Sequence, residues 1–371
     1  MFLRIKKSWI IVLCFMSLIN LYGQNNISIK GKFNNYNNEE KFIYFRDLGN
    51  KAAKPDTIII SEKGEFTIDR NIKEINYFQL GLGREDKLLM ILAPGEKINI
   101  ELDMNNISTP IKLTGSDKSE LIYKINKEIF VYDLQLDSLN KVYKNFHNTD
   151  KQDSIGGILL GQYREIENLQ KSYIRQIITE NNKSLVCLVF INRLDINKDF
   201  EIYKEYDKKI YKKYPNNIFV KDFHGKVEIE SKTAVGEIAP EINLFNPEGE
   251  KVSLSSLRGK IVLIDFWAAW CSPCRRESPN MVKIYKKFKD SGFEIYGVSL
   301  DKTKDSWLNA IKIDGLIWTH VTDLKYWKSE AALAYGVKSI PYTVLIDRDG
   351  VIITKGLRGE NLEKKLEEIF E

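Results

Sequence analysis

The residues of this chain best suited to chemistry are two cysteines, Cys271 and Cys274, in the segment DFWAAWCSPCRRESP. An apolar run over residues 260–267 precedes them and helical periodicity follows, so we expect Cys271 at the N-terminus of a helix. Unpaired backbone N–H groups and the helix dipole there favour the thiolate over the thiol. Cys271 is therefore predicted as the nucleophile, and Cys274, one turn later, as the thiol that resolves the mixed disulfide. Pro273 suits the first turn, where its missing N–H is harmless.

Two other uses of a C-x-x-C pair are weaker here. A structural zinc site needs two further cysteine or histidine ligands at suitable spacing. Outside the N-terminal leader, however, only Cys187 and three scattered histidines remain. A purely structural disulfide between such close positions removes little chain entropy and adds little stability. Redox exchange is the favoured interpretation, and we expect neither a bound metal nor a cofactor.

The N-terminal segment MFLRIKKSWIIVLCFMSLINLYGQ predicts the compartment. Its basic start, apolar centre and small Gly23 are typical of a secretory signal peptide over residues 1–23. The apolar run is shorter than the ~20 residues of a membrane span, and Leu13 is too bulky for the lipoprotein signal that Cys14 would need. We expect an exported protein of the periplasm or cell envelope. Whether the leader is cleaved, or kept so that the protein stays membrane-associated, is left open.

The composition is that of a globular, multidomain protein. The 371-residue chain is 43% hydrophobic and 29% charged, and it is longer than one hydrophobic core usually serves. The formal net charge of +5 includes Arg4, Lys6 and Lys7 of the leader, so we expect no nucleic-acid partner. Cys187 lies in the apolar run SLVCLVFI and is predicted as a buried, inert side chain.

Three regions follow the leader. Residues 24–115 alternate β-branched runs with Gly, Asn and Pro, which predicts an all-β, sandwich-like domain with hairpin turns at SEKGEF and APGEKI. Residues 116–232 show helical spacing and an expected capping box of Asp117 and Glu120. Residues 233–371 alternate strands and helices, which predicts an α/β sheet that presents the cysteines after a buried strand.

The region from about Ala234 to Glu371 resembles the thioredoxin superfamily, and specifically its TlpA/ResA-like branch of exported thiol–disulfide oxidoreductases. DFWAAWCSPC is similar to the active-site strand and turn of that family, and GVKSIPYTVLID to its cis-proline loop. The resemblance implies a C-terminal thioredoxin fold with Pro341 in the cis form beside the cysteines. It also implies that Ile340 presents its backbone to the substrate, in a groove shaped by Trp270 and Pro273.

Two acids are candidates for proton transfer to Cys274. Asp265 falls where thioredoxins keep a buried carboxylate beneath the second cysteine, and Glu277 falls where the ResA-like branch keeps a glutamate. Burial would raise the pKa of either carboxyl toward the working pH. An aspartate within IVLIDFW is costly to bury without a function. Glu277 also suits the first helical turn through the dipole, so its role stays open.

The leading hypothesis is an exported thiol–disulfide oxidoreductase that reduces disulfides of envelope proteins and draws electrons from a membrane-embedded donor. The reductive direction comes from the resemblance, which is to reductases of apocytochrome and other envelope disulfides and so points to cytochrome c biogenesis and redox homeostasis. An oxidase or isomerase stays an alternative. The substrate, the donor and the oligomeric state are left open.

A second hypothesis is an envelope binding or assembly module in which the redox site is secondary. More than half of the chain carries no recognised chemistry, and the β region resembles a small domain of unknown function that precedes thioredoxin domains in some bacterial envelope proteins. A peroxidase is disfavoured, because Ala268 stands where such enzymes have Thr or Ser three positions before the cysteine.

Overall fold

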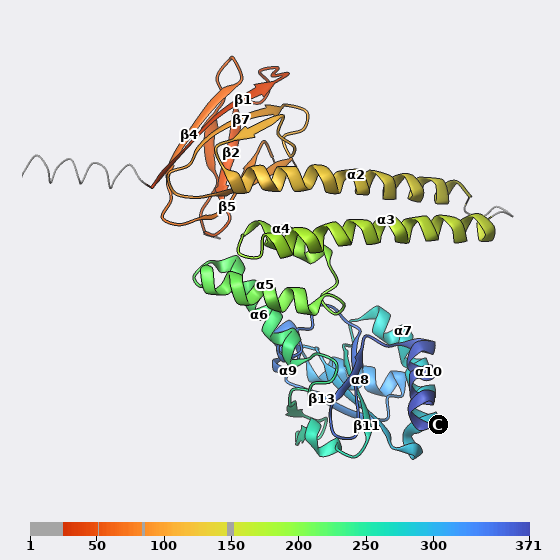
Figure 1. Ribbon diagram of the computed structural model, residues 1–371. Coiled ribbons are helices and arrows are strands. Elements are labelled where there is room, and N and C mark those ends of the chain that lie inside the picture. Colours follow the sequence, from red (N-terminus) through yellow and green to blue (C-terminus); the bar gives the residue numbers. More distant parts are fainter. Residues whose placement is uncertain (1–24, 51, 84–85, 147–151) are drawn as a thin grey trace, which may run out of the picture. The chain divides into compact units, whose positions relative to one another are not determined.

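The computed structural model describes residues 25–50, 52–83, 86–146 and 152–371 (Figure 1). The expected signal peptide over residues 1–23 lies outside the described residues. The chain divides into two compact units, Met1–Phe223 and His224–Glu371. In the part of the chain that is described, no helix is long and apolar enough to cross a membrane.

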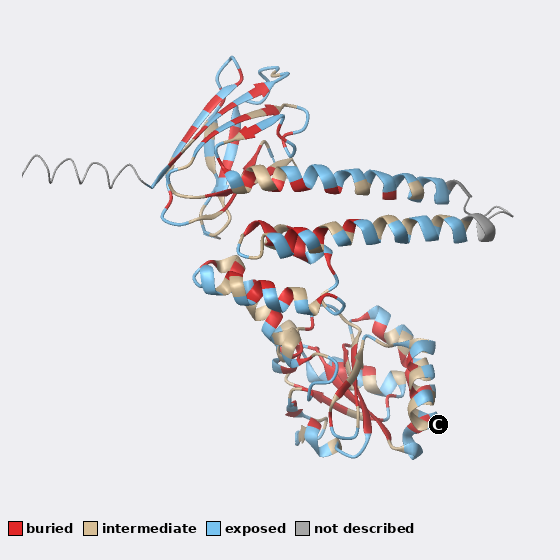
Figure 2. Ribbon diagram, in the orientation of Figure 1, coloured by how far each residue is buried: buried red, intermediate tan, exposed pale blue. Residues whose placement is uncertain are grey.

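The first unit begins with two four-stranded β-sheets. Side chains of both sheets share one core, with Ile29 and Ile100 from the first sheet and Ile43 and Phe78 from the second. Alternation of buried and exposed residues along β1 explains how one strand face joins this core (Figure 2). The prediction of an N-terminal all-β domain is confirmed. The first sheet has the order β4 (Glu65–Asn71), β1 (Asn26–Asn34), β7 (Lys97–Asp103), β8 (Lys112–Thr114), and the second the order β3 (Asp56–Ile59), β2 (Phe42–Asp47), β5 (Asn76–Gly81), β6 (Lys87–Leu92).

The two turns expected to close hairpins instead connect the sheets. SEKGEF joins β3 to β4 and APGEKI joins β6 to β7, and each of these strand pairs is divided between the two sheets. Gly64 and Gly95 do adopt the positive φ expected of them, at 76° and 86°. The prediction of hairpins was wrong because local turn chemistry fixes the backbone angle of a glycine but not the strand with which its neighbours pair.

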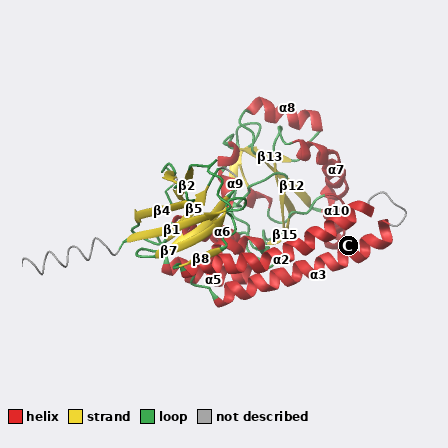
Figure 3. Ribbon diagram, turned by 90° about the horizontal axis from the view of Figure 1, so that it is seen from above, coloured by secondary structure: helices red, strands yellow, loops and turns green. Residues whose placement is uncertain are grey.

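Five helices of the described residues form the helical region. The longest two lie side by side in both Figure 1 and Figure 3. Gln170 donates a hydrogen bond to Asp133 at 2.7 Å across this pair. Most of this region belongs, with the β-sheets, to the first compact unit. The helices are α2 (Asp117–Phe146), α3 (Gln152–Glu180), α4 (Val186–Phe190), α5 (Phe200–Lys213) and α6 (Ile218–Lys232).

The start of α2 differs in one residue from the expected capping box. The carboxylate of Glu120 accepts hydrogen bonds from the backbone N–H groups of Gly115 and Ser116, at 2.8 and 3.3 Å. Asp117 is the first helical residue, and Ser116 precedes it. The Glu120 carboxylate therefore caps the start of the helix as predicted, but it accepts from the N–H groups of Gly115 and Ser116 rather than from that of Asp117.

The second unit is built on a seven-stranded mixed sheet. β11 is flanked by β12, which runs parallel to it, and by β14, which runs antiparallel. Six of the seven residues of β11 are buried, so this strand is fixed by apolar packing on both faces. The prediction of a C-terminal α/β thioredoxin fold is confirmed. The strand order is β10 (Lys251–Ser253), β9 (Asn243–Phe245), β13 (Thr319–Thr322), β12 (Phe293–Ser299), β11 (Ile261–Trp267), β14 (Tyr342–Ile346), β15 (Ile352–Lys355).

Four helices accompany this sheet. Phe288 of α7 stacks on Phe370 of α10 with ring centroids 5.7 Å apart, and Lys287 bonds Glu363 at 2.8 Å, so these two helices pack together. The chain leaves the buried end of β11 and enters α7 after only four residues, which fixes where the cysteine turn can lie. The helices are α7 (Ser272–Phe288), α8 (Lys304–Asp314), α9 (Glu330–Ala334) and α10 (Gly359–Phe370).

Candidate active site

Cys271 and Cys274 are joined by a disulfide at the start of α7. Cys271 is the residue immediately before the helix, and its Sγ accepts a hydrogen bond from the backbone N–H of Cys274 at 3.2 Å. Both side chains are largely buried, with 4% and 6% of their surfaces exposed. The structure thus puts the first cysteine where orphan N–H groups of a helix favour negative charge on sulfur.

The turn before Cys271 is held by a buried carboxylate that sequence reasoning missed. The backbone N–H of Ala269 donates to Asp301 Oδ2 at 3.0 Å, and Ser299 Oγ donates to the same oxygen at 2.7 Å. Asp301 is only 1% exposed. Its signal in the sequence is an acid directly after the buried run FEIYGVSL. Because its hydrogen bonds replace the lost water, this acid fixes the turn rather than destabilising it.

Arg275 holds the same turn from the other side. Its Nη1 donates to the carbonyl of Ala269 at 3.2 Å, and its Nη2 donates to Asp314 of α8 at 2.7 Å. Ser278 Oγ also donates to Asp314, at 3.1 Å. The planar guanidinium donates to a carboxylate and to a backbone carbonyl at the same time. It therefore fixes the backbone conformation of the turn that leads to Cys271.

A small cavity of about 20 Å³ lies beneath Cys274. Asp265, Glu277, Pro341 and Arg358 line it together with the cysteine. That volume suffices for about one water molecule. The cavity therefore brings four of the eight predicted site residues together. Of the other four, Trp270, Pro273 and Ile340 do not line it, and Cys271 reaches it only through its bond to Cys274.

The carboxyl of Asp265 has a pKa far from its ordinary value. Burial raises the pKa of its carboxyl from 3.8 to about 7, with the charge of Glu277 adding to the rise and that of Arg358 opposing it. Its side chain is partly buried and lines the cavity. A carboxyl with this pKa can take up or release a proton near neutral pH.

Glu277 has a structural partner as well as a place in the cavity. Its Oε1 accepts hydrogen bonds from the backbone N–H of Gly359, at the first residue of α10, and from Asn280 Nδ2, at 3.0 and 2.9 Å. The side chain therefore connects α7 to the N-terminus of α10, where a negative charge is favourable. The expectation that Glu277 lies in the first turn of its own helix was wrong, because α7 begins at Ser272 and Glu277 is its sixth residue. The helix N-terminus that it faces is that of α10, and its place in the cavity leaves proton transfer open.

The predicted groove residues lie at the surface around the disulfide. The Ile340–Pro341 peptide bond is cis. Trp270 is 45% exposed, and its indole N–H donates to the carbonyl of Leu300 at 3.3 Å. Pro273 is exposed and Ile340 is partly buried. These positions fit the groove that the resemblance implies.

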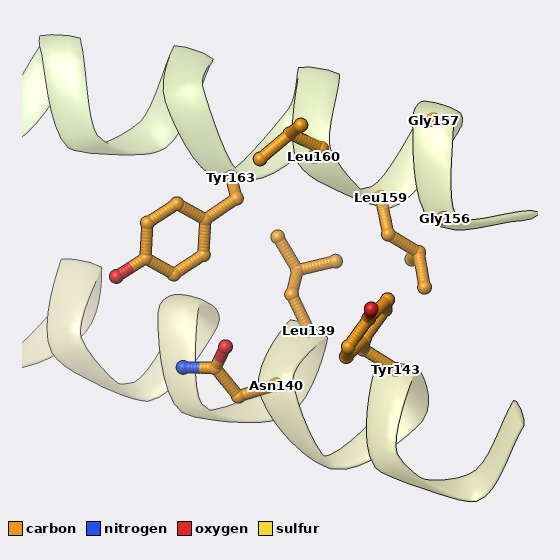
Figure 4. Close-up of a pocket in the computed structure, with 8 residues that line it drawn as sticks. All are labelled: Leu139, Asn140, Tyr143, Gly156, Gly157, Leu159, Leu160 and Tyr163. Carbon is orange, nitrogen blue, oxygen red and sulfur yellow. The ribbon is translucent and has the colours of Figure 1, made fainter. Parts of the chain in front are cut away.

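Neither Cys187 nor the pocket between α2 and α3 is suited to thiol exchange. Cys187 is a fully buried free cysteine, as predicted, and burial raises the pKa of its thiol to about 12. A pocket of about 420 Å³ between α2 and α3 has only apolar, amide, tyrosine and glycine residues along its walls (Figure 4). Over the described ranges, no group of three or more His, Cys, Asp or Glu residues could hold a metal ion.

Each of the two units contains a region that matches a known protein family. Residues 235–355 match the AhpC/TSA family, and residues 27–122 match a domain of unknown function, DUF4369. The thiol-disulfide oxidoreductase ResA of Bacillus cereus is 34% identical over 146 residues, which cover 39% of this chain and 82% of that protein. ResA of Geobacillus kaustophilus is 36% identical over 143 residues, with coverage of 38% and 80%.

Solved structures of thiol-disulfide oxidoreductases are also similar to part of this chain. The thioredoxin domain of a thiol-disulfide oxidoreductase from Bacteroides vulgatus is 40% identical with a TM-score of 0.36, and the alignment covers 37% of this chain and 99% of that domain. A thiol-disulfide oxidoreductase from Bacteroides fragilis is 34% identical with a TM-score of 0.35, covering 36% and 99%. On the identity to ResA proteins over most of their length, the chain belongs to the ResA-like thiol-disulfide oxidoreductases of the thioredoxin superfamily.

Proposed function

We propose that this thiol-disulfide oxidoreductase is exported and reduces disulfides of envelope proteins. The observation that carries the chemistry is Cys271 at the start of α7, with Cys274 behind it and Asp265 in the cavity below. The basic and apolar leader over residues 1–23 supports export. The kinship with ResA proteins supports disulfide-bonded proteins as substrates.

The proposed reaction transfers two electrons to the substrate. The Cys271 thiolate attacks one sulfur of the substrate disulfide, forms a mixed disulfide and releases the other substrate sulfur as a thiolate. Asp265 takes the proton of Cys274, and the resulting thiolate attacks Cys271 Sγ. The second substrate thiolate leaves, and the Cys271–Cys274 disulfide remains. A dithiol donor, proposed to be membrane-embedded, then reduces that disulfide.

The direction of electron flow is testable by the reduction potential of the Cys271–Cys274 pair. A reductase should lie near the ~−270 mV of thioredoxin, whereas an oxidase should lie near the ~−120 mV of DsbA. Equilibration with glutathione buffers followed by thiol alkylation measures this value. A potential near that of DsbA would reverse the proposed direction and leave the exchange chemistry intact.

The AhpC/TSA match raises peroxide reduction as a second candidate. Ala268 provides no hydroxyl three positions before Cys271, and Cys274 follows so closely that the two sulfurs are bonded. Both features favour dithiol exchange. Consumption of hydrogen peroxide by the reduced protein, compared with reduction of insulin disulfides at equal concentration, decides between them: faster turnover of peroxide would replace the proposed function.

The natural substrate can be captured by removing the resolving thiol. Cys274→Ser leaves Cys271 able to attack but unable to be released, so mixed disulfides should accumulate. Expression of this variant in the native cell, followed by separation of cell-envelope fractions and mass spectrometry of the trapped species, identifies both substrate and compartment. Trapped species confined to the cytoplasm would contradict the proposal of export.

A further inference from the structure

Three aromatic side chains cluster beside the reactive cysteine. The ring of Trp270 lies 5.2 Å from that of Tyr326 and 5.9 Å from that of Trp327, and the last two are 5.8 Å apart. Trp270 directly precedes Cys271, whereas the other two come from a short segment between β13 and α9. The fold thus brings side chains more than fifty positions apart against Trp270, the residue next to Cys271.

The segment that carries Tyr326 and Trp327 has a strained backbone. Leu324 and Tyr326 adopt φ values of 55° and 57°. Among the described residues other than glycine, the positive φ values elsewhere belong to Asn35 and Asn38, and asparagine tolerates this conformation far better than leucine or tyrosine. Such strain persists where the surrounding structure imposes it, and it concentrates at functional sites.

Hydrogen bonds impose that conformation. Asp323 accepts from the backbone N–H of Lys325 at 3.2 Å and from that of Glu330 at 2.9 Å. Thr322 Oγ1 donates to the carbonyl of Ser299, and this joins the segment to the strand next to the active site. These hydrogen bonds therefore fix the backbone of the segment that carries the two rings.

The cluster keeps much of its aromatic surface accessible. Trp270 is 45% exposed, and Tyr326 and Trp327 are only partly buried. Lys302 Nζ lies 4.4 Å from the ring centre of Tyr326 and occupies part of one face. Rigid aromatic rings that stay exposed are typical of binding surfaces, because they offer large contact areas and lose little conformational entropy.

We propose that Trp270, Tyr326 and Trp327 form an aromatic platform that binds an aromatic or large aliphatic side chain next to the substrate's reactive cysteine. The inference rests on the proposed function, because a mixed disulfide brings the two Cα atoms within about 4.4–6.8 Å. The residues that flank the substrate cysteine must then pass over the neighbours of Cys271. A flat aromatic side chain can stack on the exposed rings there.

The test uses the full chain, reduced beforehand, and short peptides that form symmetric disulfides through one cysteine. The residue next to that cysteine is Trp, Leu, Asp or Ala, and the rate of peptide reduction is followed by chromatography. We expect the wild-type protein to favour Trp over Ala by about tenfold, with Leu between them, as one well-packed aromatic contact allows. The double variant Tyr326→Ala/Trp327→Ala should reduce this ratio to about twofold.

The ratio of Trp-peptide to Ala-peptide reduction rates is measured within each variant. A general loss of activity or of folded protein lowers both rates equally and leaves the ratio unchanged. Phe42→Ala is the control, because Phe42 on β2 is an exposed aromatic residue outside the platform, at 44%, and its ratio should equal that of the wild type. No preference in the wild type, a preference that survives in the double variant, or a preference for Asp would each overturn the platform.

Hydroxyethyl disulfide separates this inference from the proposed function. The wild-type protein should reduce this small disulfide, which has no side chain for the platform to bind. Failure to reduce it or any peptide would remove the proposed exchange function itself. Reduction of all substrates without a Trp preference would remove the platform alone.

Discussion

Cys187 and Cys271 are the same residue type in opposite settings. Cys187 lies within α4, fully buried, and burial raises the pKa of its thiol to about 12. Cys271 lies immediately before α7, where its sulfur accepts a backbone N–H. A thiolate is thus opposed at the first position and favoured at the second. The comparison shows that place in a helix and access to hydrogen-bond donors, rather than residue type, decide which thiol can react.

The largest expected difference is between serine variants of the two cysteines. Cys271→Ser should lower the rate of insulin disulfide reduction by at least about a hundredfold, because it removes the nucleophile. Cys187→Ser should leave that rate unchanged within about twofold, since no step uses a thiol that stays protonated. Turbidity of reduced insulin measures both. A large loss in the Cys187 variant would break the comparison.

The next largest effect is expected from removing the carboxyl of Asp265. Asp265→Asn should slow resolution of the mixed disulfide by about a hundredfold near pH 7, because it removes the carboxyl proposed to accept the proton of Cys274. Above about pH 9 the thiol ionises unaided and the difference should shrink. Stopped-flow decay of a preformed mixed disulfide gives the pH profile. Equal profiles in both proteins would show that Asp265 is not the base.

The same carboxyl should make the second unit less stable as pH rises. Its folded-state pKa of about 7 lies above its ordinary value of 3.8, so the folded state binds more protons between those values. Stability therefore falls from about pH 4 to pH 7 and stays low above it. Asp265→Asn should raise the free energy of unfolding by about 2–4 kcal/mol at pH 8 and by little at pH 4. Urea denaturation at both pH values tests the sign.

Asp301 is more deeply buried than Asp265, and its carboxylate accepts hydrogen bonds from Ala269 and Ser299. Asp301→Ala should destabilise the second unit by about 1–3 kcal/mol, because the N–H of Ala269 and the hydroxyl of Ser299 lose their acceptor. Asp349→Ala, at an exposed turn residue, is the control and should change stability by less than about 0.5 kcal/mol. Similar values for both variants would show that the turn is held by other contacts.

The smallest effect is expected from removing the first unit. A fragment of residues 218–371 keeps both cysteines, the cavity and the core of the second unit. It should reduce hydroxyethyl disulfide within about twofold of the full chain, because compact units with their own core function separately. A loss confined to the protein substrates trapped by Cys274→Ser would assign substrate binding to the first unit. A loss on the small disulfide would show that the units act together.

Much of the second unit was predictable from local sequence. An apolar run that ends at Trp267, followed by a C-x-x-C pair and helical spacing, predicts where β11 ends and α7 begins. Family resemblance added the position of Pro341. Asp301, Tyr326 and Trp327 were not predicted as site residues, because each comes from another strand end and nothing in its own neighbourhood specifies what it contacts. The prediction that the turns at Gly64 and Gly95 close hairpins was wrong for the same reason.

The sequence by itself determined which sulfur begins a helix, which strand is apolar enough to be buried, and which turns need glycine. These properties depend on residues within a few positions of one another, where periodicity and backbone preference act directly. Only the tertiary structure decided that Asp265, Glu277 and Arg358 share a cavity with Cys274, and that Trp270 meets Tyr326 and Trp327. Contacts of that kind depend on how strands are ordered in a sheet, which no local pattern specifies.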